Sequence, residues 1–496
     1  MKYNFLPCDD IIEGILLYNN LEKEDLNSDF DLSVKAEVFY DFKNYLLNNL
    51  NKRYLIVGDY DFDGIAATTI MKRLLNHLNI ASNHYIPSRI KEGYGINERI
   101  VKVAIDNHFD TLILLDNGII AQKEINLAKE AGLDVLIIDH HEYENLPNGD
   151  VIIHDRLVDK KFADLSAAGL CYILSSLFYD DSLSLVLGAC AILSDMMSVL
   201  GFNRYLLKKM MSLINKEPSM LFLNDGKNIS YQDISFTIIP KINAISRMEN
   251  MANPNYLVRY FNDLLFQKEY IQTINKVNEA RKQETKLMTI EAEKLVDDAK
   301  ILVIASSLFK EGLCGLIANR LLQKYNKPVL VLNIENKLCK GSGRAPLGFN
   351  FHEALKDFKG YEAFGGHEAA VGLSLKYENL SSFKNYIDNI SVNDLNDEQD
   401  VLFLENDNLT YNLLNKIEEL APFGTGLKMP LLAIENKNYK RFIVSNKYPK
   451  FSIDNKLSAI SFNENLKYRD GKYFIGNLKE DTYRKNCLSF LIEDII

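Results

Sequence analysis

The sequence YLIVGDYDFDG, residues 54–64, places three carboxylates at alternating positions directly after a run of four mainly apolar residues. The run has the length and composition of a buried β-strand. Aspartates are common in turns and at helix starts, so Asp59, Asp61 and Asp63 do not by themselves establish a functional site. A functional role requires further charged residues at the ends of neighbouring strands.

Short apolar runs alternate with helix-like segments between about residues 50 and 155. The apolar runs lie at 54–57, 111–115, 134–138 and 150–154, and the clearest helical segments lie at 65–78 and 121–131. This alternation predicts βαβ units, and therefore an α/β fold with a doubly wound parallel sheet.

Three of these predicted strands are followed directly by acidic residues or histidines. Asp59, Asp61 and Asp63 follow the first, Asp116 follows the second, and the sequence DHH (139–141) follows the third. Because the carboxyl ends of parallel strands share one edge of the sheet, we expect these side chains to lie together. Carboxylates that converge in one crevice repel each other unless cations lie between them, and a mixed carboxylate and imidazole site suits manganese or a similar divalent ion.

The spacing of the acids favours a pair of ions. Asp61 and Asp63 can turn toward different ions, Asp116 is placed to bridge them, and His140 would complete the second site as a neutral imidazole. Asp195 is the single acid in a nearly all-apolar predicted helix at 182–200, where a lone carboxylate is costly unless it is paired or metal-bound. Two ions about 3.5–4 Å apart activate water and stabilise a leaving oxygen, which predicts phosphodiester or phosphoanhydride hydrolysis.

The rest of the chain predicts a connecting helix and two further domains. A mainly helical region from about 163 to 260 is followed by a long polar helix at about 262–300 without Gly or Pro. A second α/β block starts at 301 and contains GSGR (341–344) and FGGH (364–367), whose glycines we expect to lie close to a ligand. An acidic stretch at 393–400 predicts a linker, and the short β-like runs of residues 401–496 predict a small β-barrel with a basic face.

Composition indicates a soluble globular protein of about three domains. The chain has 496 residues, of which 47% are hydrophobic and 25% charged, and no apolar run is long enough to cross a bilayer. The N-terminal residues include acids where a secretory signal needs an apolar segment, and the six cysteines form no CxxC pair, so we expect a reduced, cytoplasmic protein. The net charge of −10 argues against non-specific coating of nucleic acid but allows a local basic face.

Nine motifs occur in the order found in one known family. They are GDYDFDG (58–64), PSRIKEGYGIN (87–97), DNGI (116–119), DHH (139–141), LSDMMSVLGFNR (193–204), PKINAISRM (240–248), GSGR (341–344), FGGHEAAVGLSL (364–375) and APFGTG (421–426). DHH is the signature of the DHH phosphoesterases, and the chain as a whole resembles the RecJ single-strand-specific exonuclease family. The resemblance implies a DHH domain with its N-terminal segment (1–260), a connecting helix (261–300), a smaller α/β DHHA1 domain (301–392) and an OB-like barrel that binds single strands (401–496), with the active site between the DHH and DHHA1 domains.

The same resemblance implies an activity and assigns roles to individual residues. The family degrades single-stranded DNA from its 5′ end to mononucleotides with Mn2+ or Mg2+, in DNA repair and recombination. The implied metal ligands agree with those expected from charge and strand order: Asp61, Asp63, Asp116, His140 and Asp195. The implied catalytic and phosphate-contacting residues are His141, Asp59, Arg89, Arg247, Ser342, Arg344 and His367.

Within this set, His141 would contact the scissile phosphate, and Asp59 would be a further ligand or support one. Arg247 would bind the 5′-phosphate, with an interdomain salt bridge as the alternative, since arginine forks suit phosphate oxygens as well as carboxylates. Gly341 and Gly343 would let the backbone approach phosphate. Tyr94 would stack on a base or pack within its loop, and it stays outside the catalytic set.

Some positions depart from the family pattern. Val57 stands where related proteins often have a histidine ligand, so Asp59 would have to supply that contact. The remaining departures are His154-Asp155 in place of Asn-Pro, Lys241 and Ser246 in place of Arg and Gly, and Lys310-Glu311 in place of a histidine. We expect them to affect rate and strand contacts more than the type of reaction.

Two alternatives stay open. One is a DHH phosphodiesterase acting on short oligoribonucleotides or cyclic dinucleotides, which would not need a strand-binding barrel at 401–496. The other is a DNA-binding scaffold without activity, which the complete ligand set disfavours.

For the nuclease, the expected partners are single-stranded DNA, a single-strand-binding protein and a helicase, with no membrane and a monomeric state. Among Tyr439, Phe442, Tyr448 and Phe451, some would stack on bases and others would form barrel core.

Overall fold

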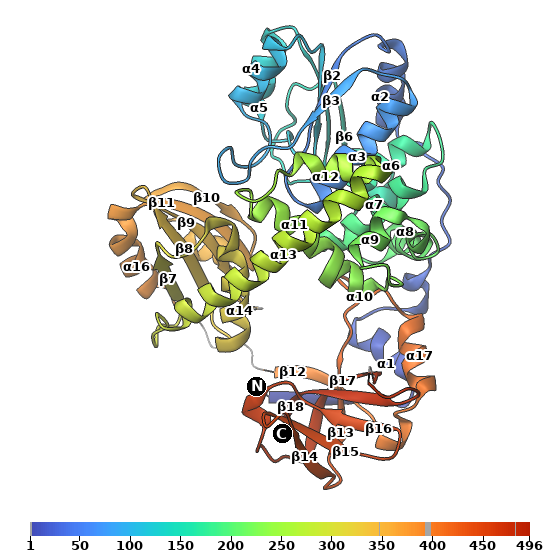
Figure 1. Ribbon diagram of the computed structural model, residues 1–496, viewed down its shortest axis with the longest axis vertical. Coiled ribbons are helices and arrows are strands. Elements are labelled where there is room, and N and C mark those ends of the chain that lie inside the picture. Colours follow the sequence, from blue (N-terminus) through green and yellow to red (C-terminus); the bar gives the residue numbers. More distant parts are fainter. Residues whose placement is uncertain (1, 347, 392–397, 482) are drawn as a thin grey trace. The chain divides into compact units, whose positions relative to one another are not determined.

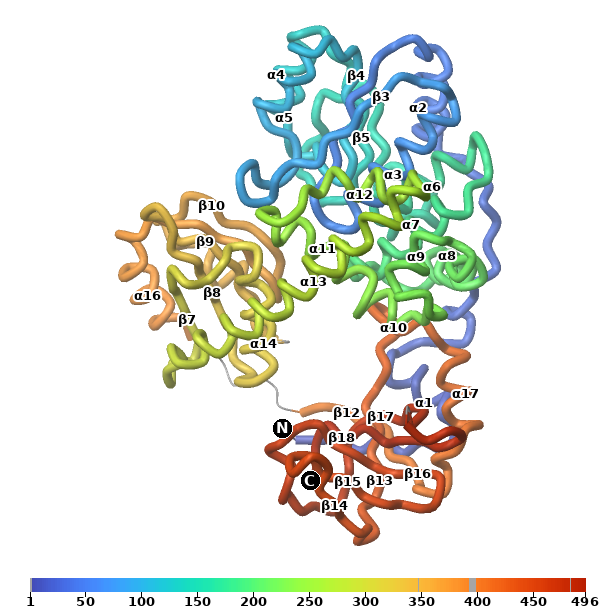
Figure 2. The backbone as a smooth tube through the Cα atoms, in the orientation of Figure 1, coloured from blue at the N-terminus to red at the C-terminus, as the bar shows by residue number. Residues whose placement is uncertain are grey.

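A computed structural model describes residues 2–346, 348–391, 398–481 and 483–496 (Figures 1 and 2). The chain divides into two compact units. The larger comprises Leu32–Asp195 and Lys209–Asn396, and the smaller comprises Met1–Asp31, Met196–Lys208 and Asp397–Ile496. Most of the predicted linker at 393–400 lies outside the described residues. Among the described residues, no helix has both the length and the hydropathy that a bilayer span requires.

The first sheet of the larger unit is parallel throughout, with the order β3-β2-β4-β5-β6. Its strands are β2 (Tyr54–Val57), β3 (Ser82–Tyr85), β4 (Thr111–Leu115), β5 (Asp134–Asp139) and β6 (Val151–His154). The four predicted strands and the α/β class are confirmed. Strand β3 has no clear sequence signal, because its sequence SNHY is polar and lies at the half-exposed edge of the sheet.

Helices cover both faces of this sheet, which explains why the inner strands are continuously apolar. On one face, α4 (Glu98–Asp106) and α5 (Gln122–Glu130) pack on alternate residues of β2, β4 and β5. On the other, α2 (Glu37–Asn48), α3 (Phe62–His77) and α6 (Ala167–Ser176) pack against the strands, and α7 (Ser182–Ser194) packs against α3 and α6. Helix α7 ends at Ser194, not at 200 as predicted, so that Asp195 is the residue that follows it.

A helical region and a long helix lead to the second sheet. The region contains α8 (Gly201–Met211), α9 (Pro218–Leu223), α10 (Tyr231–Asp233), α11 (Ile239–Arg247) and α12 (Asn255–Asn262). The predicted connecting helix is confirmed as α13 (Leu264–Glu293), which Asp263 caps by accepting hydrogen bonds from the amides of Leu265 and Phe266. It packs against α11 and α12, and also against α14 (Cys314–Tyr325) of the next domain.

The second sheet is mixed, with the order β10-β11-β9-β8-β7. Its strands are β7 (Leu302–Ser306), β8 (Val329–Glu335), β9 (Leu338–Arg344), β10 (Tyr361–Gly366) and β11 (Ala370–Lys376), and α15 (Phe351–Leu355) and α16 (Leu380–Asp388) complete the domain. Gly341 and Gly343 have a packing role in this sheet. Both lie within β9, where an added Cβ on Gly343 would be 2.7 Å from Leu330 and one on Gly341 would be 1.9 Å from the carbonyl oxygen of Val331. These glycines permit tight sheet packing, and the approach of phosphate to their backbone stays a prediction.

The smaller unit contains one sheet, with the order β1-β12-β13-β17-β18-β16-β15-β14. Its strands are β1 (Lys2–Pro7), β12 (Glu398–Phe403), β13 (Leu431–Glu435), β14 (Lys440–Val444), β15 (Tyr448–Ser452), β16 (Leu457–Ile460), β17 (Tyr473–Glu480) and β18 (Leu488–Ile495). The ring centroids of Phe451 in β15 and Phe474 in β17 lie 4.6 Å apart. A flat sheet would separate these strands by about 14 Å, so the sheet curls strongly.

The N-terminal segment belongs to this smaller unit. β1 pairs in parallel with β12, and α1 (Ile11–Tyr18) packs against α17 (Tyr411–Glu419). The resemblance implies an N-terminal segment together with a DHH domain at 1–260, and the structure groups residues 1–31 and 196–208 with the C-terminal sheet. The cause is a long-range parallel pairing, which has no local sequence signal.

Candidate metal centre

The loop after β2 presents Asp59 and Asp61, and the first turn of α3 presents Asp63. Asp61 is the N-cap of α3, and its side chain accepts a hydrogen bond from the amide of Gly64 at 3.2 Å. An added Cβ on Gly64 would lie 2.5 Å from the amide nitrogen of Asp59, so only glycine fits at this position. The loop is therefore built to bring alternating carboxylates to the end of the strand.

Asp63 is fully buried and is held by the start of α6. Its two oxygens accept hydrogen bonds from the amides of Ala167 and Ala168, each at 2.9 Å. Burial raises the pKa of Asp63, and His140 opposes that shift. The helix N-terminus favours the ionised carboxylate and fixes its orientation.

Asp116 follows β4 in the left-handed backbone region, with φ of +59°. Its amide donates to the carbonyl of Ile138 at 2.9 Å, and the hydroxyl of Tyr94 donates to the carbonyl of Asp116 at 2.8 Å. Aspartate and asparagine tolerate this conformation better than most residues. The strained backbone turns a buried carboxylate toward the acids of the neighbouring loop.

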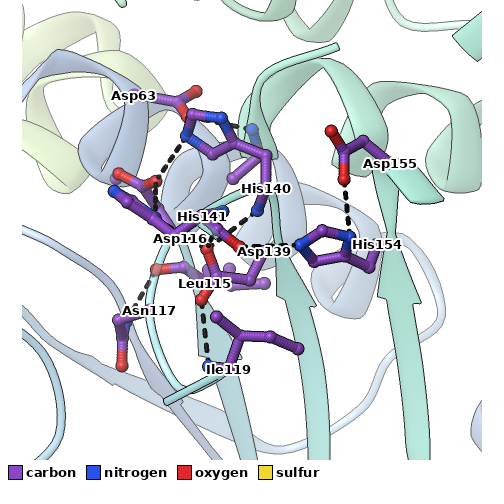
Figure 3. A network of polar contacts seen from close by, with 12 residues as sticks. Asp63, Leu115, Asp116, Asn117, Ile119, Asp139, His140, His141, His154 and Asp155 are labelled. Atoms are coloured by element: carbon purple, nitrogen blue, oxygen red, sulfur yellow. Dashed lines mark hydrogen bonds and ion pairs between the residues drawn. The ribbon is translucent and has the colours of Figure 1, made fainter. Parts of the chain in front are cut away.

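Asp139, the last residue of β5, organises the two histidines that follow it (Figure 3). One oxygen accepts from the amides of His140 and His141 at 2.8 and 3.2 Å and lies 2.8 Å from Nδ1 of His141. The other oxygen accepts from the amide of Ile119 at 3.0 Å. Burial alone would raise the pKa of Asp139, but these hydrogen bonds lower it, so it stays ionised and fixes both ring-bearing residues.

His154 supports the same turn from β6. Its Nε2 donates to the carbonyl of His141 at 2.9 Å, and its Nδ1 lies 2.5 Å from Oδ1 of Asp155 (Figure 3). Burial alone would lower the pKa of His154. Asp155 and the carbonyl of His141 act in the opposite direction and outweigh burial, so the pKa is raised. The His154-Asp155 pair thus holds the backbone of the DHH sequence and takes the place of the Asn-Pro pair of related chains.

His140 is the point at which the acids converge. Its Nε2 lies 3.2 Å from Asp116, 3.3 Å from Asp195 and 3.6 Å from Asp63. Burial would lower the pKa of His140, but the surrounding carboxylates, Asp116 and Asp195 first, raise it to about 12.

The side chains form two groups of potential metal-ligand atoms. Within each group, the carboxylate oxygens and imidazole nitrogens all lie within 4.8 Å of one another. One group is Asp63, Asp116, His140 and Asp195, and the other is Asp59, Asp61 and Asp116. Asp116 belongs to both groups. His141 also lies within this distance of Asp116 and His140.

The donor atoms fit divalent ions. Oδ1 of Asp59, Oδ1 of Asp116 and Nε2 of His140 are buried, and among the described residues none has a partner with hydrogen-bond geometry. Burial and then the neighbouring carboxylates raise the pKa values of Asp59 and Asp116, and they raise the pKa of Asp195 to about 7. A cation between the groups would satisfy these atoms and remove the repulsion, and oxygen ligands with one imidazole suit manganese.

Arginines gather beside the acids. Burial and then the guanidinium groups of Arg89, Arg281 and Arg344 lower the pKa of Arg247 to about 9, whereas Asp61 opposes this shift. The Nη1 atom of Arg247 donates to the carbonyl of Gly312 at 3.2 Å, and the Arg89 guanidinium lies 4.8 Å from the ring centre of Tyr60. Clustered guanidinium groups next to a metal centre form a site for an anion such as phosphate.

The other predicted phosphate contacts lie on the second sheet. Ser342 and Arg344 lie two positions apart in β9, and both side chains reach the start of α14. A Cβ added to Gly315 of that helix would lie 3.5 Å from the hydroxyl oxygen of Ser342 and 3.2 Å from Nη2 of Arg344. His367 lies in the exposed turn between β10 and β11, where its amide donates to the carbonyl of Ala370 at 2.8 Å.

Three departures from the family pattern have structural explanations. Val57 packs in the core under α4 and α5, while a carboxylate oxygen of Asp59 lies near those of Asp61 and Asp116. Lys241 is buried and donates to the carbonyl of Leu223 at 2.7 Å. Lys310 pairs with Glu284 at 2.5 Å.

Sequence reasoning missed the supporting roles of Asp139, His154 and Tyr94. Asp139 could have been identified, since it ends a predicted strand immediately before two histidines. The contacts of Tyr94 with the carbonyl of Asp116, and with Nδ1 of His141 at 3.1 Å, bring together different loops and have no sequence signal.

Family models match three consecutive segments of the chain. They are the DHH family, N-terminal domain, at residues 53–193, the DHHA1 domain at 298–393 and the RecJ OB domain at 402–494. The first two are domains of the DHH family. With the third, they form in this order the set of domains of the RecJ proteins of that family.

Named relatives and solved structures agree with this assignment. The single-stranded-DNA-specific exonuclease RecJ of Bacillus subtilis is 28% identical over 486 residues, which cover 92% of this chain and 62% of that protein. The RecJ of Haemophilus influenzae is 25% identical over 483 residues, covering 84% and 82%. The chain therefore spans less than two thirds of the length of the Bacillus relative.

The fold matches a crystal structure of RecJ in complex with Mn2+ from Thermus thermophilus, with a TM-score of 0.86 and 19% identity over 100% of this chain and 79% of that one. It also matches a structure of exonuclease RecJ bound to manganese, with a TM-score of 0.62 and 24% identity over 73% and 95% of the two chains. At these identities the likeness concerns the fold.

Proposed function

We propose that this protein is a metal-dependent exonuclease that degrades single-stranded DNA from its 5′ end and releases 5′-mononucleotides. The observation that carries the proposal is that Asp116 belongs to both ligand groups, which is the arrangement that two bridged ions require. The relatives named as single-stranded-DNA-specific exonucleases support this choice of substrate.

Each ligand group would hold one Mn2+ or Mg2+ ion. Asp63, Asp116, His140 and Asp195 would hold one ion, and Asp59, Asp61 and Asp116 the other. When bound, the ions supply an activated water and stabilise the leaving oxygen of a phosphodiester. The protein contributes the fixed positions: the start of α6 orients Asp63, and the left-handed turn orients Asp116.

His141 would act on the scissile phosphate. Asp139 engages its Nδ1, which makes Nε2 the ring nitrogen available to a ligand, and the His141 side chain is 39% exposed. A charge-assisted hydrogen bond from this nitrogen would stabilise negative charge that develops on a phosphate oxygen. The His154-Asp155 pair keeps the His141 backbone in place for that contact.

The arginine cluster would bind the phosphates of the strand. Arg89 and Arg344 are the expected contacts of phosphates near the metals, with Ser342 and His367, and Arg247 is the expected contact of the 5′-phosphate. Arg247 stays protonated near neutral pH, because its lowered pKa is still about 9. A bound phosphate would relieve the repulsion among the guanidinium groups, which favours an anionic chain end.

The C-terminal sheet offers a surface for the rest of the strand. Along β14, Lys440, Phe442 and Val444 are exposed, and the Lys440 ammonium lies 5.2 Å from the centre of the Phe442 ring. Phe442 is 45% exposed, whereas Phe451 is barrel core at 1% exposure. An exposed aromatic ring beside a lysine can stack on a base while the charge contacts phosphate.

Because the enzyme would need single strands, a helicase and a single-strand-binding protein are the partners we infer. They would act with it in DNA repair and recombination in the cytoplasm.

End-labelled oligonucleotides test the proposal. With Mn2+, the purified protein should release mononucleotides from the 5′ end of a phosphorylated single strand and leave a blunt duplex intact. Asp116→Asn should abolish turnover, while Asp106→Asn, which alters an exposed aspartate of α4, should not. An inert wild-type protein would contradict the proposal, and faster turnover of a dinucleotide than of a long strand would favour an oligonucleotide phosphodiesterase instead.

A further inference from the structure

The loop between β3 and α4 carries Arg89 and is fastened by two carboxylates. Glu92, within the loop, accepts hydrogen bonds from the hydroxyl of Tyr85 and the amide of Ser88, each at 2.9 Å. Glu249, from the segment after α11, accepts from the amide of Arg89 at 2.5 Å and from the hydroxyl of Ser88. Glu92 therefore closes the loop on itself, whereas Glu249 ties it to a different part of the domain.

Glu249, which holds the Arg89 loop, is close in sequence to Arg247, the second arginine proposed to bind phosphate. Glu249 lies two residues after Arg247, the last residue of α11, whose guanidinium is fixed by the carbonyl of Gly312 at 3.2 Å. Arg89 lies over the ring of Tyr60, so both its backbone and its side chain have a defined place. Two guanidinium groups that face one site repel each other, and a flexible loop would relieve that repulsion by moving Arg89 into solvent.

We propose that Glu249 is a positioning residue that fixes the backbone of Arg89, so that Arg89 and Arg247 contact the phosphates of one DNA end together. The inference rests on the proposed exonuclease function. Glu249 touches neither the metal ligands nor the substrate in this account, and it acts through the two hydrogen bonds to the Arg89 loop. The loop is then ordered before the strand arrives, which reduces the entropy lost on binding.

A glutamine at position 249 separates positioning from simple charge neutralisation. In Glu249→Gln, the amide oxygen still accepts from the Arg89 amide, and the amide nitrogen can donate to the Ser88 hydroxyl. The variant loses the negative charge but keeps both contacts. Glu249→Ala loses both the charge and the contacts.

Four variants test the proposal: Glu249→Ala, Glu249→Gln, Ser88→Ala and the double variant of Ser88→Ala with Glu249→Ala. Affinity for a 5′-phosphorylated single strand is measured by fluorescence anisotropy without metal, and KM and kcat are measured with Mn2+. Glu249→Ala should raise Kd and KM about tenfold with kcat changed less than about twofold, as expected for the loss of about 1.4 kcal/mol of binding. Ser88→Ala should act in the same direction, and the double variant should be no weaker than Glu249→Ala alone.

The matched control is Glu98→Ala, which removes an exposed glutamate of α4 that pairs with Lys123, and it should behave like the wild type. Glu249→Gln should recover most of the lost affinity. Unchanged affinity of Glu249→Ala, or equal weakness of the Gln and Ala variants, would refute the positioning role. If the wild type binds the strand without cutting it, the proposed activity fails, and the anisotropy comparison still decides the role of Glu249.

Discussion

Replacing Asp116 with asparagine should stabilise the metal-free protein, although Asp116 lies at the centre of the proposed active site. The carboxylate is buried and shares its surroundings with four other acids in the two ligand groups. Asparagine adopts the left-handed backbone region as readily as aspartate, so the φ of +59° adds no strain. The substitution therefore removes charge and leaves the backbone unchanged.

The size of the effect follows from the distances. Two charges 4.8 Å apart, the limit for atoms within a group, repel by about 3 kcal/mol at an effective dielectric constant of about 20. Proton uptake limits the total penalty to about 6 kcal/mol near pH 8, because a carboxyl group with an ordinary pKa of about 3.9 can be protonated instead. Attraction to His140, 3.2 Å away, offsets part of this penalty. We expect the free energy of unfolding to rise by about 2 kcal/mol near pH 8.

The sign of the pH dependence is fixed by the raised pKa of Asp116. A folded state that holds the proton more tightly than the unfolded state loses stability as the pH rises above the ordinary pKa. The advantage of Asp116→Asn should therefore be small near pH 5, at under about 1 kcal/mol, and largest near pH 8. Urea denaturation with EDTA at both pH values measures it.

Manganese should narrow the stability advantage of the variant. An ion present at about 100 times its Kd stabilises the wild type by about 2.7 kcal/mol, and the variant should gain less than half of that. A variant that is less stable than the wild type in EDTA near pH 8, together with equal stabilisation of both proteins by Mn2+, would refute the idea that Asp116 is a repelled, metal-bridging carboxylate.

Three further predictions concern the supports of the site and the proposed DNA-binding surface. Gly64→Ala should destabilise the fold by about 2 kcal/mol or more in thermal melts, because its Cβ would meet the backbone of Asp59, and a smaller loss would argue against a rigid loop. Asp139→Asn should lower kcat at least about tenfold with little change in KM, since His141 loses its orientation, and equal changes in both constants would contradict that role. Phe442→Ala should weaken the binding of a long single strand by about 1–3 kcal/mol in anisotropy titrations and leave the binding of a dinucleotide unchanged. Equal losses for both ligands would exclude a stacking role.

Much of the clustering of these acids and His140 could be predicted because it depends on strand order. In a parallel sheet, residues directly after β2, β4 and β5 must meet at one edge, and Asp61, Asp116 and His140 occupy those positions. Asp195 was predictable for another reason, since a single acid at the end of an apolar helix needs a partner.

What the sequence did not reveal depends on contacts between distant segments. The pairing of β1 with β12 joins residues almost 400 positions apart, and nothing local distinguishes β1 from a strand of the first sheet. The contact of Glu249 with the Arg89 loop is of the same kind. The packing role of the GSGR glycines was hidden for the same reason, because it depends on the strands next to β9.

The central claim is that two ions share Asp116, and electron paramagnetic resonance of the Mn2+-loaded protein tests it most directly. Ions about 3.5–4 Å apart are close enough to couple magnetically. We expect the wild type to bind two ions per chain and to give the spectrum of a coupled pair. The Asp116→Asn variant should give the spectrum of a single ion. One ion per chain, or two uncoupled ions in the wild type, would contradict it.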